Sequence, residues 1–223
     1  MEINTKKNKE LLLLIIAVCG VFVTLFGLLL FNNYLLKAFP LPLRAILAVA
    51  TQWLLFLVPG ILMLARKERI QDFGFAKNGL GNQILIGLCI AFVMSAFLTV
   101  IPILLGLQQM VGSTNYTQAW QFVYEFIYKI CGVALVEELI FRGYIFNKLM
   151  LIKNNKWLAI IVSSILFGLF HVFNGNLMQI LITALIGVIY CLCREKIKNC
   201  TILSLIVAHG VYGALIVLCV GLL

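Results

Sequence analysis

Charged residues are scarce in this chain. Only 11% of its 223 residues are Asp, Glu, Lys or Arg, and just eight are acidic. Hydrophobic residues make up 63% of the sequence, and the mean hydropathy is +1.10. Soluble domains contain about 25% charged and about 45–50% apolar residues, so this composition excludes a soluble protein and predicts a multi-pass membrane protein. The length allows about seven spans of roughly 20 residues, with no room for a separate soluble domain.

The chain also has few prolines, no internal repeats and no metal-binding pattern of cysteines. The chain has four prolines, and none of them lies in the last three apolar stretches. Transporters tend to have repeats and interrupted helices, so transport is the less favoured alternative. The spacing of Cys191, Cys193 and Cys200 matches no zinc-binding pattern. We therefore expect the seven cysteines to be small apolar residues of the interior.

Seven apolar stretches follow one another along the chain. A segment that spans lipid has to satisfy its backbone hydrogen bonds internally, so each stretch is predicted to be a helix. The predicted fold class is all-α: a polytopic membrane bundle of about seven transmembrane helices, forming a single integral-membrane domain. Residues 1–121 hold the first three helices, and residues 122–223 hold the other four. The stretches are Leu11–Phe31, Ala45–Ala65, Ile84–Leu107, Phe122–Ile152, Trp157–Phe173, Leu177–Cys193 and Thr201–Leu223.

Basic residues cluster in every second loop. Thirteen of the 17 Lys and Arg residues lie in the N-terminal tail and in the loops after the second, fourth and sixth stretches. The loops of the opposite side contain only Lys37 and Arg44. Because cytoplasmic loops are enriched in Lys and Arg, the N-terminus is predicted to be cytoplasmic and the C-terminus outside. The loops also account for the net charge of +9, so we expect no nucleic acid as a partner. The expected location is the cell membrane, in a bacterium.

A few charged and histidine side chains interrupt the last four stretches. Such groups are costly inside a membrane and are by default candidates for a functional site. With Lys148 taken as the cytoplasmic end of its helix, Glu137 lies about 16 Å deep in a core about 30 Å thick. The same count puts His171 about 21 Å and His209 about 12 Å deep. We therefore expect Glu137, His171 and His209 to meet near the middle of the membrane.

Glu137 and Glu138 are neighbours with different predicted roles. Glu138 and Arg142 are four residues apart, which puts them on one helix face in the favourable order for an ion pair. Glu137 points about 100° away and is expected to face the two histidines. A carboxylate in a low-dielectric pocket has a raised proton affinity, which suits a general base at neutral pH. The alternative is that Glu137 and the histidines only link helices by hydrogen bonds.

Three motifs in the second half of the chain resemble those of the CPBP intramembrane protease family, which includes CAAX prenyl proteases and bacteriocin self-immunity or processing proteins. The pattern EExxxR is present from Glu137 to Arg142, and FxxxH from Phe167 to His171. The third pattern, HxxxN, is matched only by His209, since Gly213 stands where asparagine is usual. The resemblance extends from about Val123 to the C-terminus.

The resemblance implies an intramembrane endopeptidase that hydrolyses a peptide bond in a membrane-anchored peptide or protein. Glu137 would be the catalytic base, His171 would hold the attacking water, and His209 would stabilise the oxyanion. Phe167 would line the site, and Arg142 would hold Glu138. The family has been described both as metalloproteases and as metal-independent glutamate enzymes. Zinc bound by Glu137, His171 and His209 is one alternative; activation of water by Glu137 and His171 alone is the other.

Gly213 suggests an alternative function. Loss of one oxyanion donor typically lowers the rate by about 10²–10³. Tyr212 could act as a substitute donor, but lining the bundle is its favoured role, and Asn174 and Asn176 are expected to form the outer turn after His171. The second hypothesis is a catalytically weak or inactive family member that acts as a membrane scaffold or as a bacteriocin-immunity protein. For Gly213 itself, and for Gly168, Gly187 and Gly210, close helix packing is the simplest prediction.

Overall fold

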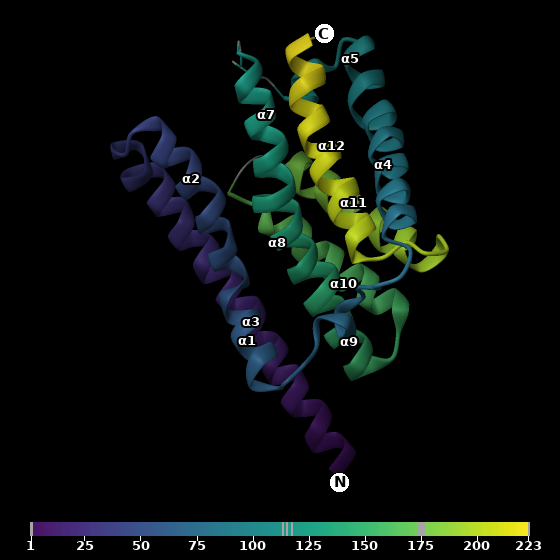
Figure 1. The fold of residues 1–223 in the computed structure, drawn as a ribbon. Coiled ribbons are helices and arrows are strands. Elements are labelled where there is room, and N and C mark those ends of the chain that lie inside the picture. Colours follow the sequence, from purple (N-terminus) through teal and green to yellow (C-terminus); the bar gives the residue numbers. More distant parts are fainter. Residues whose placement is uncertain (1, 113, 115, 117, 174–176, 223) are drawn as a thin grey trace. The chain divides into compact units, whose positions relative to one another are not determined.

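The computed structural model describes residues 2–112, 114, 116, 118–173 and 177–222, and the secondary structure of this part of the chain is entirely helical (Figure 1). The prediction of an all-α fold is therefore confirmed. Five helical segments of the described chain are long and apolar enough to cross a membrane, which makes it a multi-pass membrane protein. These segments are Lys7–Ala38, Leu41–Ala65, Leu80–Leu104, Leu177–Lys196 and Ile202–Leu222.

Two further helical segments of the described chain complete the predicted set of seven. One is α10 (Lys156–Phe170), which is apolar but has only 15 residues. The other is helical from Ala119 to Lys153 and carries the charged residues of the candidate site. It consists of α7 (Ala119–Ile127), η6 (Tyr128–Ala134), α8 (Leu135–Glu138), η7 (Leu139–Ile145) and α9 (Phe146–Lys153).

The remaining helices correspond closely to the predicted stretches. The first segment is α1 (Glu2–Leu30), continued by η1 (Phe31–Leu35) and η2 (Leu36–Ala38). The second contains α2 (Leu41–Gln52), η3 (Trp53–Phe56) and α3 (Leu57–Ala65), and η4 (Ile70–Phe73) follows it. The third contains α4 (Leu80–Ser95), η5 (Ala96–Val100) and α5 (Ile101–Leu104), followed by α6 (Gln108–Val111). The last two are α11 (Leu177–Lys196) and α12 (Ile202–Leu222).

The chain forms two compact units. Unit 1 contains residues 1–75 and 136–198, and unit 2 contains residues 76–135 and 199–223. Each unit therefore takes helices from both sides of residue 121, where the sequence was divided. The boundary at residues 135 and 136 falls inside the helical segment that carries Glu137.

Unit 1 is packed through small residues. A Cβ atom added to Gly20 of α1 would lie 2.7 Å from Val58 of α3, so only glycine fits there. Helices α10 and α11 meet in the same way, because a Cβ at Gly168 would lie 2.7 Å from the carbonyl oxygen of Ile180. A Cβ at Gly187 would lie 3.0 Å from Ser164. The predicted packing role of Gly168 and Gly187 is confirmed.

Unit 2 is built around α12, which packs against α4 and η6. A Cβ at Gly87 of α4 would lie 2.5 Å from the carbonyl oxygen of Ser204. On η6, the Cα atom of Ile130 would lie 2.8 Å from a Cβ at Gly210, which confirms the packing role of that glycine. The start of α12 is tied to the start of α4, because the Thr201 hydroxyl donates to Oε1 of buried Gln83 at 2.5 Å.

Candidate active site

The two adjacent glutamates lie in α8 of unit 1. Glu137 is 4% exposed and Glu138 is fully buried. The stretches on either side of α8, η6 and η7, are π-helical, with wider turns than an α-helix. Such turns are uncommon and occur often at functional sites, because they release backbone carbonyl groups from the regular helix ladder. At the end of η7, the N–H of Phe146 donates to the carbonyl of Phe141. The carbonyl of Arg142 is thereby released.

Glu138 and Arg142 form the ion pair that their spacing predicts. Nη1 of Arg142 donates to Oε1 of Glu138 at 3.0 Å, and both side chains are at most 1% exposed. A buried pair of this kind neutralises two charges that would otherwise be very costly to hold in an apolar interior. The pair leaves one net negative charge, that of Glu137, on this turn of the helix when Glu137 is ionised.

Aromatic rings complete the surroundings of Arg142. Its guanidinium carbon lies 4.1 Å from the centroid of the Phe167 ring and 5.4 Å from that of Tyr190. Within the described residues, Nε and Nη2 of Arg142 have no hydrogen-bond acceptor, so these cation–π contacts are what compensates their burial. Arg142 therefore connects the helix of the glutamates to α10 and α11 within unit 1.

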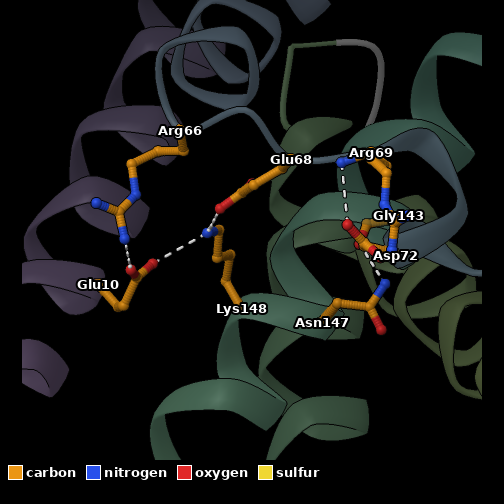
Figure 2. Close-up of polar contacts among 8 residues, drawn as sticks. All are labelled: Glu10, Arg66, Glu68, Arg69, Asp72, Gly143, Asn147 and Lys148. Carbon is orange, nitrogen blue, oxygen red and sulfur yellow. Dashed lines mark hydrogen bonds and ion pairs between the residues drawn. The ribbon is translucent and has the colours of Figure 1, made fainter.

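The backbone of the same stretch is held by two polar side chains. Nη1 of Arg194 donates to the released carbonyl of Arg142 at 2.6 Å, and its Nη2 donates to Asn147 at 3.3 Å. Nδ2 of Asn147 in turn donates to the carbonyl of Gly143 at 2.6 Å, as Figure 2 shows. The wide turns after Glu138 are thus fixed from α9 and from α11.

Phe167 and His171 lie one turn apart at the end of α10. The Phe167 ring is buried between the guanidinium of Arg142 and the imidazole of His171, whose centroid is 5.0 Å away. Phe141 packs edge-on against Phe167, with the ring centroids 5.2 Å apart. Phe167 therefore joins the ion pair to His171 through direct contacts in unit 1.

The hydrogen bond of His171 defines its tautomer. Nδ1 lies 2.9 Å from the carbonyl oxygen of Phe167. A carbonyl oxygen can only accept, so Nδ1 carries the proton and donates it in this bond. In the neutral ring Nε2 then has a lone pair, which can accept a hydrogen bond from water. The side chain is half-buried.

His171 marks the end of α10 and is not part of a longer helix that continues to Phe173. A helix of 15 residues rises about 22 Å, less than the core thickness of about 30 Å. The predicted run to Phe173 was therefore too long by three residues, because the helix ends at Phe170 and residues 171–173 form a turn.

The start of α10 has a clear cause, since Oδ1 of Asn155 accepts from the N–H of Leu158 at 3.1 Å.

His209 belongs to unit 2, where it lies in α12 and is half-buried. Gly213 is four residues later and so lies on the same face of α12. Its Cβ position is only in ordinary contact with Lys129, 3.4 Å from Cδ. Gly213 thus differs from Gly168, Gly187 and Gly210, since close helix packing does not require a glycine there. Tyr212 is buried, and Asn174 and Asn176 lie outside the described residues.

One segment of the chain matches a protein-family model. Residues 119–215 match the model described as type II CAAX prenyl endopeptidase Rce1-like. This segment belongs to the Rce1-like family. The match contains the two complete motifs and the histidine of the third, and it leaves residues 1–118 and 216–223 outside. No curated protein and no solved structure matches the chain.

Membership of the Rce1-like family implies an intramembrane protease that acts on a membrane protein or peptide. The Rce1-like segment contains every residue that the sequence singled out: Glu137, Glu138, Arg142, Phe167, His171, His209 and Gly213. Unit 1 brings together Glu138, Arg142, Phe167 and His171 through the contacts described above, and Glu137 is the adjacent residue. In each unit taken by itself, the described residues contain no group of three His, Cys, Asp or Glu side chains that could hold a metal ion.

A second ionic cluster in unit 1 has no counterpart in the sequence predictions. Lys148 of α9 is only 4% exposed, and its Nζ pairs with Oε2 of Glu10 at 3.0 Å and with Glu68 (Figure 2). Arg66 pairs with the other oxygen of Glu10 at 2.6 Å. Lys148 therefore lies inside the protein and is not the cytoplasmic end of its helix, contrary to the sequence prediction. The helix continues to Lys153, five residues further.

The sequence held one signal for this cluster. Glu10 stands at the start of an otherwise uncharged apolar run, and Glu68 stands among basic residues in the loop after α3. Both are acidic residues in basic segments, which suggests local pairing. Nothing in the sequence indicates that their shared partner is Lys148, which is 138 residues from Glu10.

Proposed function

We propose that this protein is an intramembrane endopeptidase in which Glu137 activates a water molecule. The observation that carries the proposal is the difference between the two adjacent glutamates of α8. Glu138 is neutralised by Arg142 in a buried ion pair, and Glu137 is buried one residue before it. A buried carboxylate beside a neutralised ion pair can act as a general base toward a water molecule in the site.

The proposed reaction needs one base and two hydrogen-bonding groups. Glu137 takes a proton from water, and the resulting hydroxide attacks the carbonyl carbon of the scissile peptide bond. His171 orients the water through the lone pair of Nε2, which the hydrogen bond at Nδ1 leaves available. His209 donates to the oxyanion of the tetrahedral intermediate. Glu137 then gives its proton to the leaving nitrogen, and the products are a carboxylate and an amine.

Arg142 and Phe167 are proposed as positioning residues. Arg142 pairs with Glu138 and holds its side chain in place, which fixes the turn that carries both glutamates. Phe167 lies in contact with both Arg142 and His171. Its ring excludes water from the ion pair, which strengthens the electrostatic interactions there. Loss of this ring would loosen the position of His171 relative to the helix of Glu137.

A membrane orientation accompanies this mechanism. We propose a cytoplasmic N-terminus and an outer C-terminus, as the distribution of basic loops predicts. The ionic contacts of unit 1 support it, because they join the basic segments to each other. Glu10 links the N-terminal segment to Lys148 and Arg66, and Lys156 pairs with Glu195 at 2.7 Å.

The test uses purified protein in proteoliposomes with a fluorogenic peptide that ends in an S-prenylated Cys-aliphatic-aliphatic-X sequence, the type of substrate that the family description names. Glu137→Gln and His171→Ala are expected to abolish cleavage. Glu195→Gln, which changes a glutamate of the Lys156 ion pair, is the matched control and is expected to retain activity. Cleavage by Glu137→Gln at the rate of the control contradicts the proposal.

A non-catalytic membrane scaffold is the second candidate function, and Gly213 favours it. A Cβ atom at this position would make only ordinary contacts, yet the position lacks the asparagine that the family usually has there. A scaffold would bind the prenylated peptide or a partner protein without cleaving it, and binding would survive both Glu137→Gln and His171→Ala. Mass spectrometry of the peptide after incubation with the wild-type protein distinguishes the two functions.

A further inference from the structure

Lys129 is a basic residue inside the helical segment 119–153, in η6 of unit 2. It is half-buried, and no acidic residue forms an ion pair with it in the part of the chain that the structure describes. The other buried basic residues described above, Arg142 and Lys148, each have a carboxylate partner. An ionisable residue in a membrane helix is costly and is by default a candidate for a functional role. Lys129 therefore requires an explanation.

The nearest acidic residue in sequence is already engaged. Glu125 lies four residues before Lys129, at the spacing of a helical ion pair. Its Oε1 instead accepts a hydrogen bond from the hydroxyl of Tyr116 at 2.7 Å. Burial and this bond to Glu125 raise the pKa of Tyr116, so the hydroxyl stays protonated and keeps donating. The ammonium of Lys129 lies 5.7 Å from the centroid of the Tyr128 ring.

The stem of Lys129 lies on the face of α12 that carries His209. A Cβ at Gly213 would lie 3.4 Å from Cδ and 3.7 Å from Cγ of Lys129. Gly213 and His209 are one turn apart on this face. The neighbouring contact of Ile130 with Gly210 brings the two backbones close together at the same level. Lys129 thus occupies the space into which a side chain at residue 213 would extend.

We propose that Lys129 replaces the missing asparagine by binding a negatively charged oxygen of the substrate beside His209. The inference rests on the proposed function, since it needs a peptide bond to be cleaved at this site. The oxygen is either the oxyanion that forms at the scissile carbonyl or the terminal carboxylate of the substrate. An ammonium group has three donors and a full charge, so it stabilises either one.

The decisive variant is Lys129→Met, which keeps an unbranched stem against Gly213 and removes the charge. For the oxyanion, we expect kcat to fall by about 10²–10³ with KM little changed, as for removal of one oxyanion donor. Lys129→Arg keeps the charge and is expected to retain most of the activity. Lys37→Met, at a lysine of a predicted outer loop, is the matched control and is expected to behave like the wild type.

A second variant tests the replacement itself. Gly213→Asn in the Lys129→Met background introduces a neutral donor from the same side, and the flexible methionine can yield to it. We expect this double variant to recover part of the lost kcat. If Lys129 only fills space, Lys129→Met has the kcat of the wild type, and Gly213→Asn in that background gives no increase in kcat. The thermal midpoint of each variant in detergent shows whether it is folded.

Two probe peptides distinguish the sources of the oxygen. One ends in a free carboxylate and the other in an amide. If Lys129 binds the oxyanion, Lys129→Met lowers kcat for both peptides. If it binds the terminal carboxylate, the variant raises KM for the first peptide only. The inference would be overturned if Lys129→Met had the kcat and KM of the wild type on both peptides while Glu137→Gln was inactive. That result would leave the proposed function intact. Activity in Glu137→Gln would instead remove the proposed function.

Discussion

Unit 1 and unit 2 hold their polar groups in different ways. In unit 1 the buried basic residues are paired with carboxylates: Arg142 with Glu138, and Lys148 with Glu10 and Glu68. In unit 2 the packing relies on glycines of α4 and α12, and Lys129 contacts Gly213 without an acidic partner among the described residues. The difference indicates that ion pairs maintain the structure around Glu137 in unit 1, whereas the role proposed for Lys129 in unit 2 is to bind an oxygen of the substrate.

The largest effect on stability is expected for Arg142→Met. This change leaves Glu138 fully buried and removes its cationic partner. Breaking a buried pair from one side destabilises a protein by about 3–5 kcal/mol. The thermal midpoint in detergent should therefore fall strongly. Adding Glu138→Leu removes the second charge, and we expect the double variant to regain much of the lost stability. A double variant as unstable as Arg142→Met would contradict the structural role assigned to the ion pair.

A smaller effect is expected for Lys148→Met in the second ionic cluster. Glu10 keeps Arg66 as a partner at 2.6 Å, so its carboxylate still has an ion pair in the variant. Loss of a hydrogen-bond partner in the interior costs about 1–3 kcal/mol. A double-mutant cycle with Glu10→Gln should give a coupling energy clearly above zero. Additive effects of the two changes would show that the buried contact of Lys148 with Glu10 contributes nothing to stability.

Two glycines of α12 allow a direct comparison inside unit 2. A Cβ at Gly210 would lie 2.6 Å from the Ile130 side chain and 2.8 Å from its Cα atom, so Gly210→Ala forces two backbones apart. Overpacking of this kind costs about 1–3 kcal/mol. Gly213→Ala places its Cβ 3.4 Å from the flexible Lys129 stem and should change the thermal midpoint least of all. Equal destabilisation by the two changes would contradict the packing described for α12.

The local parts of this structure could be predicted from the sequence. Apolar length and composition gave the helical segments, because a chain in lipid has no other way to satisfy its backbone. The pairing of Glu138 with Arg142 depends only on a spacing of four residues and is present at 3.0 Å. The glycines of α10, α11 and α12 could also be recognised, with Gly213 as the exception.

The other features depend on contacts that are distant in sequence or on small changes in helix geometry. The pairing of Lys148 with Glu10 requires α1 and α9 to pack together, which no local pattern encodes. The wide turns around α8 follow from tertiary contacts, such as that of Arg194 with the carbonyl of Arg142. No local sequence pattern predicted that α10 ends at Phe170 or that the stem of Lys129 lies beside Gly213.

The most direct test of the central proposal follows the oxygen of water into the product. Wild-type protein and Glu137→Gln, both folded in proteoliposomes, are incubated with the prenylated probe peptide in oxygen-18-labelled water, and the new carboxyl terminus is analysed by mass spectrometry. We predict that the wild-type protein gives a labelled carboxylate at the cleaved bond, and that Glu137→Gln gives none. Labelled product from Glu137→Gln at the wild-type rate would contradict the assignment of Glu137 as the base.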